Sequence, residues 1–305
     1  MPTEKTFRSY SQEQGKAYAQ ARQDYHPKVY QTVVDLHTST GGQLNTLIDV
    51  GCGPGLAARG LAGYFAHVTG IDPSEGMIAT ARSLGGETSA SEPIRYELST
   101  AEELGSNLGE PVGDASVDLI TASNAAHWFD MPAFWARAAQ VLKPGGTVTL
   151  WTSGEIRIHP SMPNAAAAQA AMDRYSTVTL KAYYDPGNAM VREGYAHLPL
   201  PWNITPAVLG FDESAFIRKE WAPGSAFFVG LGEGNMDLFE KVMATGSPYT
   251  RWSEAHPADA GTERDVLRML RREIEGLLQE SGVEKGQEMI KADVQGVILM
   301  VKKRQ

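Results

Sequence analysis

The glycine-rich stretch 46–56, T-L-I-D-V-G-C-G-P-G-L, constrains the fold of this chain more than any other feature. Residues 46–50 are mostly apolar, which is typical of a buried parallel strand. This apolar run ends where the glycines begin, at Gly51, Gly53 and Gly55. A glycine has no Cβ, so a ligand can lie directly against the main chain of such a turn. A helical pattern follows over residues 56–66. Strand, turn and helix N-terminus together predict a nucleotide-sized site at the carboxyl end of a parallel sheet.

The spacing after the turn indicates which nucleotide ligand the site takes. A dinucleotide-binding turn, G-x-G-x-x-G/A, has a third small residue three positions after its second glycine. That position is Leu56 here, so the pattern departs from the NAD fingerprint. A second predicted strand, 67–71, ends in Asp72, about 20 residues past the turn, where a carboxylate can accept hydrogen bonds from ribose hydroxyls. The alternatives are that the glycine turn is purely structural and that Asp72 is a helix N-cap. Neither alternative explains why the glycine turn and Asp72 occur together, about 20 residues apart.

The pattern D-x-G-x-G-x-G, which begins at Asp49, resembles the first motif of class I S-adenosylmethionine-dependent methyltransferases. Residues 72–78, D-P-S-E-G-M-I, look like the second motif of the same family. The resemblance implies S-adenosyl-L-methionine as the cofactor, held by Asp49 and the three glycines. It also implies that Asp72 holds the ribose and that Met77 packs against the adenine, with Ser74 in the same motif.

Residues just after a third predicted strand, 94–98, are expected at the adenine ring. By the resemblance, Ala101 and Glu102 contact this ring. Glu102 has a second interpretation, because Ser99 or Thr100 could cap a helix here and Glu102 or Glu103 would then complete a capping box. Both interpretations stay open at this point.

The rest of the core alternates in type, with strands at 116–122 and 147–151 and helices at 75–84 and 131–142. Five β–α steps in alternation predict an α/β fold with a doubly wound parallel sheet. The fourth strand ends at the same edge as the glycine turn, so residues 123–130 should rim the ligand crevice. Asn124 and His127 are the candidates from this rim, Asn124 for the cofactor and His127 for catalysis.

Beyond Trp151 the alternation stops. Residues 152–211 are too long for a simple connection in a compact sheet, which indicates an inserted cap over the crevice. Two late strands, 215–221 and 296–301, match the antiparallel pair that ends the class I methyltransferase sheet. We therefore expect a Rossmann-like, doubly wound, mostly parallel seven-stranded sheet. We expect four parts: an N-terminal lid (1–30), a cofactor-binding core (31–152), an inserted substrate cap (153–213), and a C-terminal part that completes the sheet and adds cap helices (214–305).

The N-terminal segment, residues 7–30, is rich in tyrosine and interspersed charge. Tyr18, Arg22 and Tyr25 lie near i, i+4 and i+7, on one face of a helix if the segment is helical throughout. Pro27 then predicts the end of that helix, because the residue before a proline disfavours helical geometry. This face either packs on the body or belongs to a lid over the ligand. The resemblance favours the lid, in which Tyr18 and Tyr25 contact the cofactor.

Composition limits the partners of this 305-residue chain. Its net charge of -9 argues against the broad basic face of a nucleic-acid binder. The single cysteine, Cys52, cannot form an internal disulfide and argues against a cysteine-based metal site, so no metal is expected. No apolar run approaches the roughly 20 residues that cross a bilayer, and residues 1–16 lack a signal-type apolar region. We expect a cytoplasmic protein with a small-molecule substrate and no nucleic-acid or membrane partner; its oligomeric state stays open.

Three short motifs narrow the resemblance: A-H-W-F-D at 126–130, Y-D-P-G at 184–187, and S-P-Y at 247–249 followed by Trp252. In this order they resemble the trans-aconitate methyltransferases and their fungal relatives. The resemblance implies an O-methyltransferase that converts a carboxylic acid, such as trans-aconitate, to a methyl ester.

The expected chemistry is displacement on a sulfonium methyl group, so the protein mainly has to align the reacting atoms and exclude water. A carboxylate, with an ordinary pKa of about 4, is ionised at neutral pH and needs no base. Arg22 and Arg251 are the candidates to position it. A phenol or hydroxyl acceptor needs a base, for which His127 is the candidate. Each of these candidates has a plainer interpretation: the two arginines could be solvated at the surface, and His127 could simply be packed in the core. There are also two alternative functions. Leu56 disfavours an NAD oxidoreductase, whereas a protein that binds the cofactor without transferring its methyl group stays open.

Overall fold

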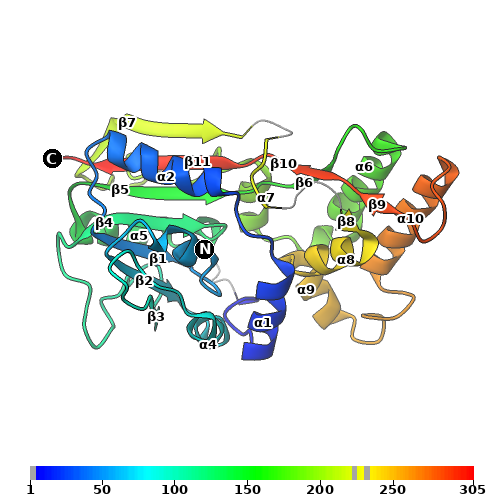
Figure 1. The fold of residues 1–305 in the computed structure, drawn as a ribbon, viewed down its shortest axis with the longest axis horizontal. Helices are drawn as coiled ribbons and strands as arrows, with labels where there is room; N and C mark the ends of the chain where they lie inside the picture. The colour runs from blue at the N-terminus through cyan, green and yellow to red at the C-terminus, as the bar shows by residue number, and fades with distance from the viewer. Residues whose placement is uncertain (1–4, 222–224, 230–233) are drawn as a thin grey trace.

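A seven-stranded sheet, in the order β3-β2-β1-β4-β5-β11-β7, forms the centre of the protein (Figure 1). The computed structural model describes residues 5–221, 225–229 and 234–305. The strands of the sheet span Thr46–Val50 (β1), His67–Asp72 (β2), Arg95–Leu98 (β3), Val117–Ser123 (β4), Leu142–Thr152 (β5), Phe211–Glu220 (β7) and Val297–Lys303 (β11). Strands β1 to β5 run parallel, while β11 pairs antiparallel with both β5 and β7. The predicted doubly wound, mostly parallel sheet is confirmed.

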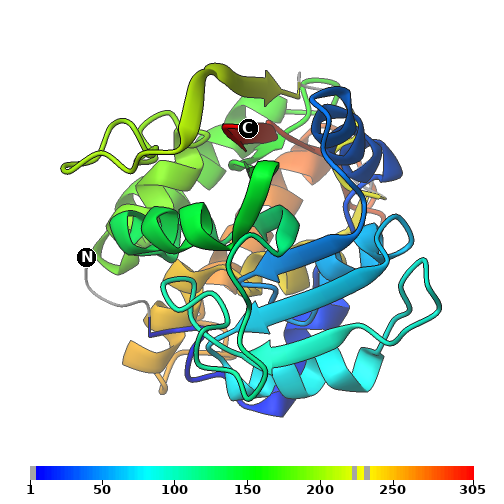
Figure 2. The same ribbon diagram turned by 90° about the vertical axis from the view of Figure 1, so that its left-hand side faces the viewer.

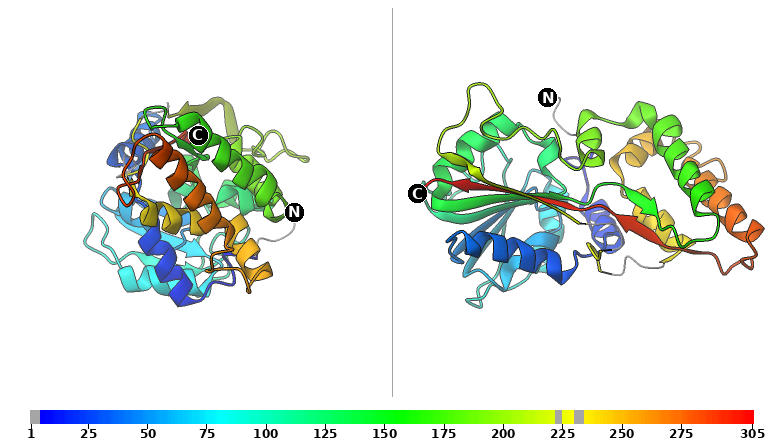
Figure 3. Two further views of the ribbon diagram at one scale, coloured as in Figure 1. Left: turned by 90° about the vertical axis from the view of Figure 1, so that its right-hand side faces the viewer. Right: turned by 90° about the horizontal axis from the view of Figure 1, so that it is seen from above.

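Both faces of the central strands β1, β4, β5 and β11 are buried, which explains why these strands are largely apolar. Successive residues of a strand point to opposite faces, and Leu47 and Ile48 accordingly belong to different core clusters. The cluster of Leu47 is covered by α2 (Pro27–Ser39), α3 (Leu56–Ala62) and α4 (Glu75–Leu84), and that of Ile48 by α5 (Met131–Val141). Figures 2 and 3 show these helices on the two sides of the sheet. The carboxyl edge of the strands is therefore where a ligand can approach.

A second lobe lies beyond that edge (Figures 1 and 3). One core cluster joins its helices, which are α6 (Ala165–Arg174), a π-helix (Tyr175–Thr179), α8 (Met236–Ala244), α9 (Ser247–Ala255) and α10 (Val266–Glu280). Two short antiparallel pairs add to it, β6 (Ile156–Ile158) with β10 (Ala292–Val294) and β8 (Gly234–Asn235) with β9 (Met289–Ile290). The insertion after β5 and the last third of the chain thus share one hydrophobic core.

The N-terminal segment differs from the expected continuous helix. Helix α1 spans Gln12–Ala21, and the chain becomes extended at Arg22. Tyr25 therefore lies outside any helix, so the prediction of one helical face with Tyr18, Arg22 and Tyr25 is wrong at Tyr25. Pro27 begins α2, because its missing N–H would have no helical partner in a first turn anyway.

Two other local predictions also differ from the structure. The residues after β3 form successive turns instead of a helix, although Thr100 and Glu103 exchange the hydrogen bonds of a capping box. The strand predicted over 147–151 begins earlier, because segment 143–146 also belongs to β5, which pairs with β4 from Leu142 onward. Helix and strand follow each other there without a loop, since Leu142 is already extended.

Two further observations concern only this described part of the chain. None of its helices is both long and apolar enough to cross a membrane. None of its groups of His, Cys, Asp and Glu is arranged to hold a metal ion.

Candidate active site

The glycine turn between β1 and α3 has a backbone that explains its sequence. Gly51, Gly53 and Gly55 have φ angles of 62°, 53° and 81°, which L side chains rarely adopt. A Cβ on Gly51 would come within 2.7 Å of the Cβ of Ala125, and one on Gly55 within 2.6 Å of the Tyr96 hydroxyl. A Cβ on Gly53 would meet no atom of the described residues within 4 Å. Gly53 is therefore the point where a ligand can lie against the main chain.

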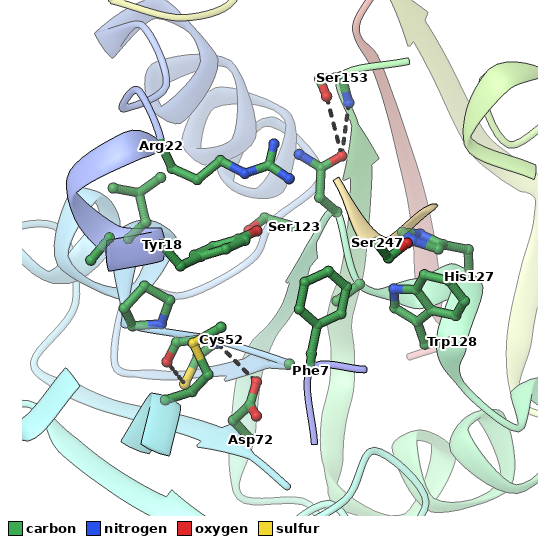
Figure 4. A pocket seen from close by; sticks show the side chains of 18 of the residues that line it. Phe7, Tyr18, Arg22, Cys52, Asp72, Ser123, His127, Trp128, Ser153 and Ser247 are labelled. Carbon is green, nitrogen blue, oxygen red and sulfur yellow. Dashed lines mark hydrogen bonds between the residues drawn. The ribbon is translucent and has the colours of Figure 1, made fainter. Parts of the chain in front are cut away.

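A cavity of about 500 Å³ opens beside this turn (Figure 4). This volume is in the range of small-molecule sites. Most of the predicted site residues line it, namely Tyr18, Arg22, Tyr25, Gly51, Gly53, Asp72, Met77, Ala101, Glu102, Asn124 and His127. The others lie behind or away from its wall: Asp49, Gly55, Ser74 and Arg251.

Asp72, at the end of β2, is held between the turn and the next helix. Its Oδ2 accepts a hydrogen bond from the backbone N–H of Gly53 at 2.9 Å, and its Oδ1 accepts one from that of Ser74 at 2.8 Å. Ser74 is buried and caps α4, since its Oγ accepts from the N–H of Met77 at 3.4 Å. Ser74 therefore supports the helix, while Asp72 and Met77 face the cavity.

Asp49 lies beneath the turn, fully buried in β1. Its Oδ1 accepts a hydrogen bond from the Thr121 hydroxyl at 2.8 Å. Burial raises the pKa of the Asp49 carboxyl to about 7, although the hydrogen bond from Thr121 opposes this shift. Asp49 thus supports the turn from below and does not reach the cavity.

Asn124 fixes the wall opposite the turn. It follows β4 with a φ of 48°, a conformation that asparagine tolerates better than most residues. Its side-chain amide donates to the Tyr25 hydroxyl at 2.8 Å, and its Oδ1 accepts from the Thr152 hydroxyl at 2.8 Å and from the Ser153 N–H at 3.0 Å. Burial raises the pKa of Tyr25 well above its ordinary value, so this side chain is a neutral phenol. Asn124 thereby joins the N-terminal segment to β4 and β5.

Glu102 has a structural bond of its own. Its Oε1 accepts from the backbone N–H of Asp130 at 2.8 Å, which ties the turns after β3 to the start of α5. Of the two acids predicted for the capping box, Glu102 and Glu103, Glu103 makes the interaction, with Thr100. Glu102 and Ala101 both line the cavity.

Arg22 brings a positive charge to the cavity (Figure 4). Its guanidinium lies over the ring of Tyr18, 5.0 Å from the centroid. Its Nε is buried without a hydrogen-bond partner, and no carboxylate among the described residues forms an ion pair with it. The Arg22 side chain is half-buried, and a cation in a cavity wall without a counter-ion among the described residues favours an anionic ligand.

His127 lies on a short 3-10 helix, η1 (Ala126–Trp128), at the cavity rim. It is buried, and its Nδ1 is 2.8 Å from the Tyr195 hydroxyl. Burial, followed by the charge of Arg22, lowers the pKa of His127 to about 3. The imidazole is therefore neutral at neutral pH and too weakly basic to titrate near pH 6 to 7.

Arg251 does not take the position expected for it. Its guanidinium is bound by the side chains of Asp185 and Asn188, the latter at 2.8 Å, and by the backbone oxygen of Tyr183, also at 2.8 Å. These contacts tie α9 to α7 (Pro186–Arg192) and the short helix before it. Arg251 is therefore occupied within the second lobe and is not presented to the cavity, which corrects its expected role beside a substrate.

Phe7 lines the cavity although no motif pointed to it. Its ring lies edge-on to those of Tyr10, Tyr18 and Trp128, at centroid distances of 5.4, 5.9 and 6.4 Å. Figure 4 shows it between Asp72 and Trp128. The only signal in the sequence was the aromatic composition of the N-terminal segment, which does not specify which ring faces the cavity.

Comparison with known proteins identifies the enzyme class. A family model described as a methyltransferase domain matches residues 48–150, which contain the glycine turn, Asp72 and Asn124. A Dictyostelium discoideum protein that bears the name of a methyltransferase is 28% identical over 238 residues, which cover 75% of this chain and 82% of that protein. The chain is an S-adenosylmethionine-dependent methyltransferase.

Two further matches agree with this. A Saccharomyces cerevisiae protein named as an S-adenosylmethionine-dependent methyltransferase is 28% identical over 134 residues, but the match covers only 44% of this chain and 43% of that protein. A solved structure from Anaeromyxobacter dehalogenans, named as a type II methyltransferase, matches with a TM-score of 0.58 and 24% identity. The match covers 93% of this chain and 97% of that protein's chain, which shows that the two share a fold. The methyltransferase therefore uses S-adenosyl-L-methionine.

Proposed function

We propose that this methyltransferase acts on a carboxylic acid and forms its methyl ester. The observation that carries the proposal is Arg22, a guanidinium in the cavity wall without a counter-ion among the described residues. A guanidinium matches the two oxygens of a carboxylate with two parallel N–H donors. Trans-aconitate, which the sequence resemblance implies, is one acid of this class.

The cavity also fits the cofactor, which supplies an electrophilic methyl group on a sulfonium. The open position at Gly53 leaves room for a ligand against the main chain, and the carboxylate of Asp72 is placed to accept from ribose hydroxyls. In this proposal the adenine is bounded by Met77, Ala101 and Glu102, and the methionine end by Tyr18, Tyr25 and Asn124. The turn and helix that present these groups are held in place by Asp49, Gly51, Gly55 and Ser74.

The lid and cap belong to the same proposal. Residues 1–30, which carry Phe7 and Arg22, act as the lid, and residues 153–213 with the helices of 214–305 act as the substrate cap. Lid residues such as Arg22 and cap residues such as Asn188 line the cavity at the carboxyl edge of the sheet, where they exclude water from the reacting groups. The last part of the cap segment runs back along the sheet to Phe211, which pairs with Lys303 at the opposite edge.

A carboxylate acceptor suits a site without an active base. An acid with an ordinary pKa of about 4 is ionised at neutral pH, so no proton has to be removed. His127 is neutral and bound to Tyr195, and it can orient the acceptor or exclude water without transferring a proton. The remaining task of the chain is to hold nucleophile, carbon and sulfur in line.

S-adenosylmethionine carries a carboxylate of its own, which competes with the acceptor for Arg22. The two assignments differ in a measurable way. If Arg22 holds the acceptor, its loss raises the KM of the acid. If it holds the cofactor, its loss raises the Kd of S-adenosylmethionine.

Kinetics of Arg22→Gln test the proposal. We expect kcat/KM for the acid to fall about 10²-fold, mainly through KM, because a hydrogen bond to a charged group contributes roughly 1.5 to 3 kcal/mol. The matched control is Arg264→Gln, which removes a largely exposed guanidinium paired with Asp259 and should behave like wild type. A weakened cofactor Kd with an unchanged KM for the acid would contradict the assignment of Arg22. Methylation of phenols but of no acid would reject ester formation altogether.

A further inference from the structure

A second cavity, of about 230 Å³, adjoins the first on the side of the second lobe. The two cavities share Arg22, Asn188 and Pro248 among their lining residues. The remaining wall of the second cavity comes largely from β6, α6, α8 and β10, which are remote from the glycine turn in the sequence. Arg22 therefore lies where a compartment for the cofactor meets a separate compartment.

The wall of the second cavity is mainly apolar away from Arg22. Ile156, Met172, Val242, Met243 and Val294 line it, and they come from four different elements of the second lobe. An apolar part of a ligand gains by leaving water for such a wall.

Among the described residues of this wall, one cationic side chain has no ion pair. Arg192 forms an ion pair with Glu155. Asp173 adds a carboxylate, whose Oδ1 accepts from the Gln169 side chain at 2.8 Å. Of the described arginines and lysines that line the second cavity, only Arg22 has no ion pair. The cavity thus provides one place for an anion, and apolar or acidic surface elsewhere.

We propose that the acceptor is an acid with a single carboxylate and an apolar body, an inference that rests on the proposed ester formation. The carboxylate lies at Arg22 and one of its oxygens attacks the methyl carbon. The new O–CH₃ bond forms as the S–CH₃ bond breaks, and the electron pair of that bond returns to sulfur and neutralises it. The apolar body occupies the second cavity. A tricarboxylate would instead bring further negative charge against Asp173, whereas Glu155 is already paired with Arg192; repulsion between the like charges disfavours the tricarboxylate.

A comparison of octanoate with trans-aconitate, at saturating S-adenosylmethionine, tests the inference. We expect kcat/KM for octanoate to exceed that for trans-aconitate by about tenfold or more. Equal or faster turnover of trans-aconitate would overturn the inference and leave ester formation intact. Turnover of a phenol such as 4-nitrophenol, with no acid methylated, would reject the proposed function itself.

Two pairs of variants locate the selectivity in the second cavity. Val242→Gln should lower kcat/KM for octanoate about tenfold more than for trans-aconitate, because it places an amide on the apolar wall. Val178→Gln is its control, since Val178 is 71% exposed on the same lobe and lies outside the cavity.

Asp173→Asn should raise the ratio of trans-aconitate to octanoate turnover about tenfold, because it removes a negative charge from the cavity. Its control is Glu193→Gln, an exposed acid that does not line the cavity and should leave the ratio as in wild type. Parallel changes for both acids in Val242→Gln and Asp173→Asn would overturn the inference, because the second cavity would then not distinguish between them.

Discussion

The two halves of the site are built in different ways. The half beside the glycine turn consists of strand ends, backbone N–H groups and a carboxylate, all within residues 48–150. The half beside the second lobe consists of side chains from segments far apart in the chain, such as Arg22, Met172 and Val242. The positions of the groups in the first half follow from the local backbone geometry of strand, turn and helix, and this geometry limits which residues the sequence can have there. The second depends on how separate segments pack, so it can change its ligand without changing the fold.

A side chain at Gly53 should break the first half most severely. Gly53→Val puts a β-branched residue at a φ of 53° and fills the open space beside the turn. We expect calorimetry to show S-adenosylmethionine affinity reduced about 10²-fold or more. Gly63→Val is the control, because Gly63 has a φ of -64° and no neighbour near a Cβ. Unchanged binding by a folded Gly53→Val protein would remove the turn from the cofactor site.

Removal of the carboxylate at the end of β2 should cause the next largest loss of cofactor affinity in the same half of the site. Asp72→Ala removes the acceptor for the Gly53 N–H and the proposed ribose acceptor. We expect cofactor binding to weaken by about 1 to 3 kcal/mol in the same titration. Asp35→Ala, at an exposed position on α2, should bind normally. Cofactor affinity that matched wild type would argue against a ribose contact at Asp72.

The buried support of the turn should make stability depend on pH. The Asp49 carboxyl has a pKa of about 7 in the folded protein, above its ordinary value of 3.8, so the folded chain holds a proton that the unfolded chain releases. Its contribution is fully present below the ordinary pKa and is lost as the pH rises through 7. Between pH 5 and 8 we expect Asp49→Asn to gain about 2 kcal/mol of unfolding free energy relative to wild type. Denaturant titrations across this range measure it, and a pH-independent difference would contradict the raised pKa.

The smallest expected effect is on turnover and concerns helix α1 of the N-terminal segment, which precedes Arg22. A Cβ on Gly15 of α1 would come within 2.7 Å of the Thr80 hydroxyl and 2.9 Å of the Gly76 backbone oxygen on α4. Gly15→Leu should therefore displace α1 and lower kcat about tenfold, because a lid that closes poorly admits water. Glu13→Leu, on the exposed side of α1, is the control. Full turnover in Gly15→Leu would show that α1 only packs on the core.

The same contrast explains how much the sequence could predict. The run from β1 through the glycine turn to Asp72 could be located because strand, turn and helix signals follow one another within a few residues. The extended course at Tyr25 could not, because its bridging partner, Phe228, is distant in the chain. Arg251 was misassigned for the same reason, since the residues that neutralise it belong to another segment. Side chains whose partners are remote in sequence have no local pattern that would indicate their contacts.

The unusually low basicity of His127 also had no sequence signal. Its motif placed it at the rim, but its pKa depends on burial and on the nearby charge of Arg22, which come from the packing of the N-terminal segment and of the segment that carries Tyr195. The sequence thus located the residue, and the structure determines which chemistry it can perform.

The pH dependence of single-turnover methyl transfer, at saturating cofactor, tests the central claim that the acceptor is a carboxylate and that no base is used. For wild type we expect a nearly flat rate above about pH 6, where the acid is ionised. His127→Asn, which can keep a hydrogen bond to Tyr195, should follow the same flat profile with little loss. A rate that rises through pH 6 to 7 in wild type, and falls about 10²-fold or more in His127→Asn, would contradict the account and make His127 the general base.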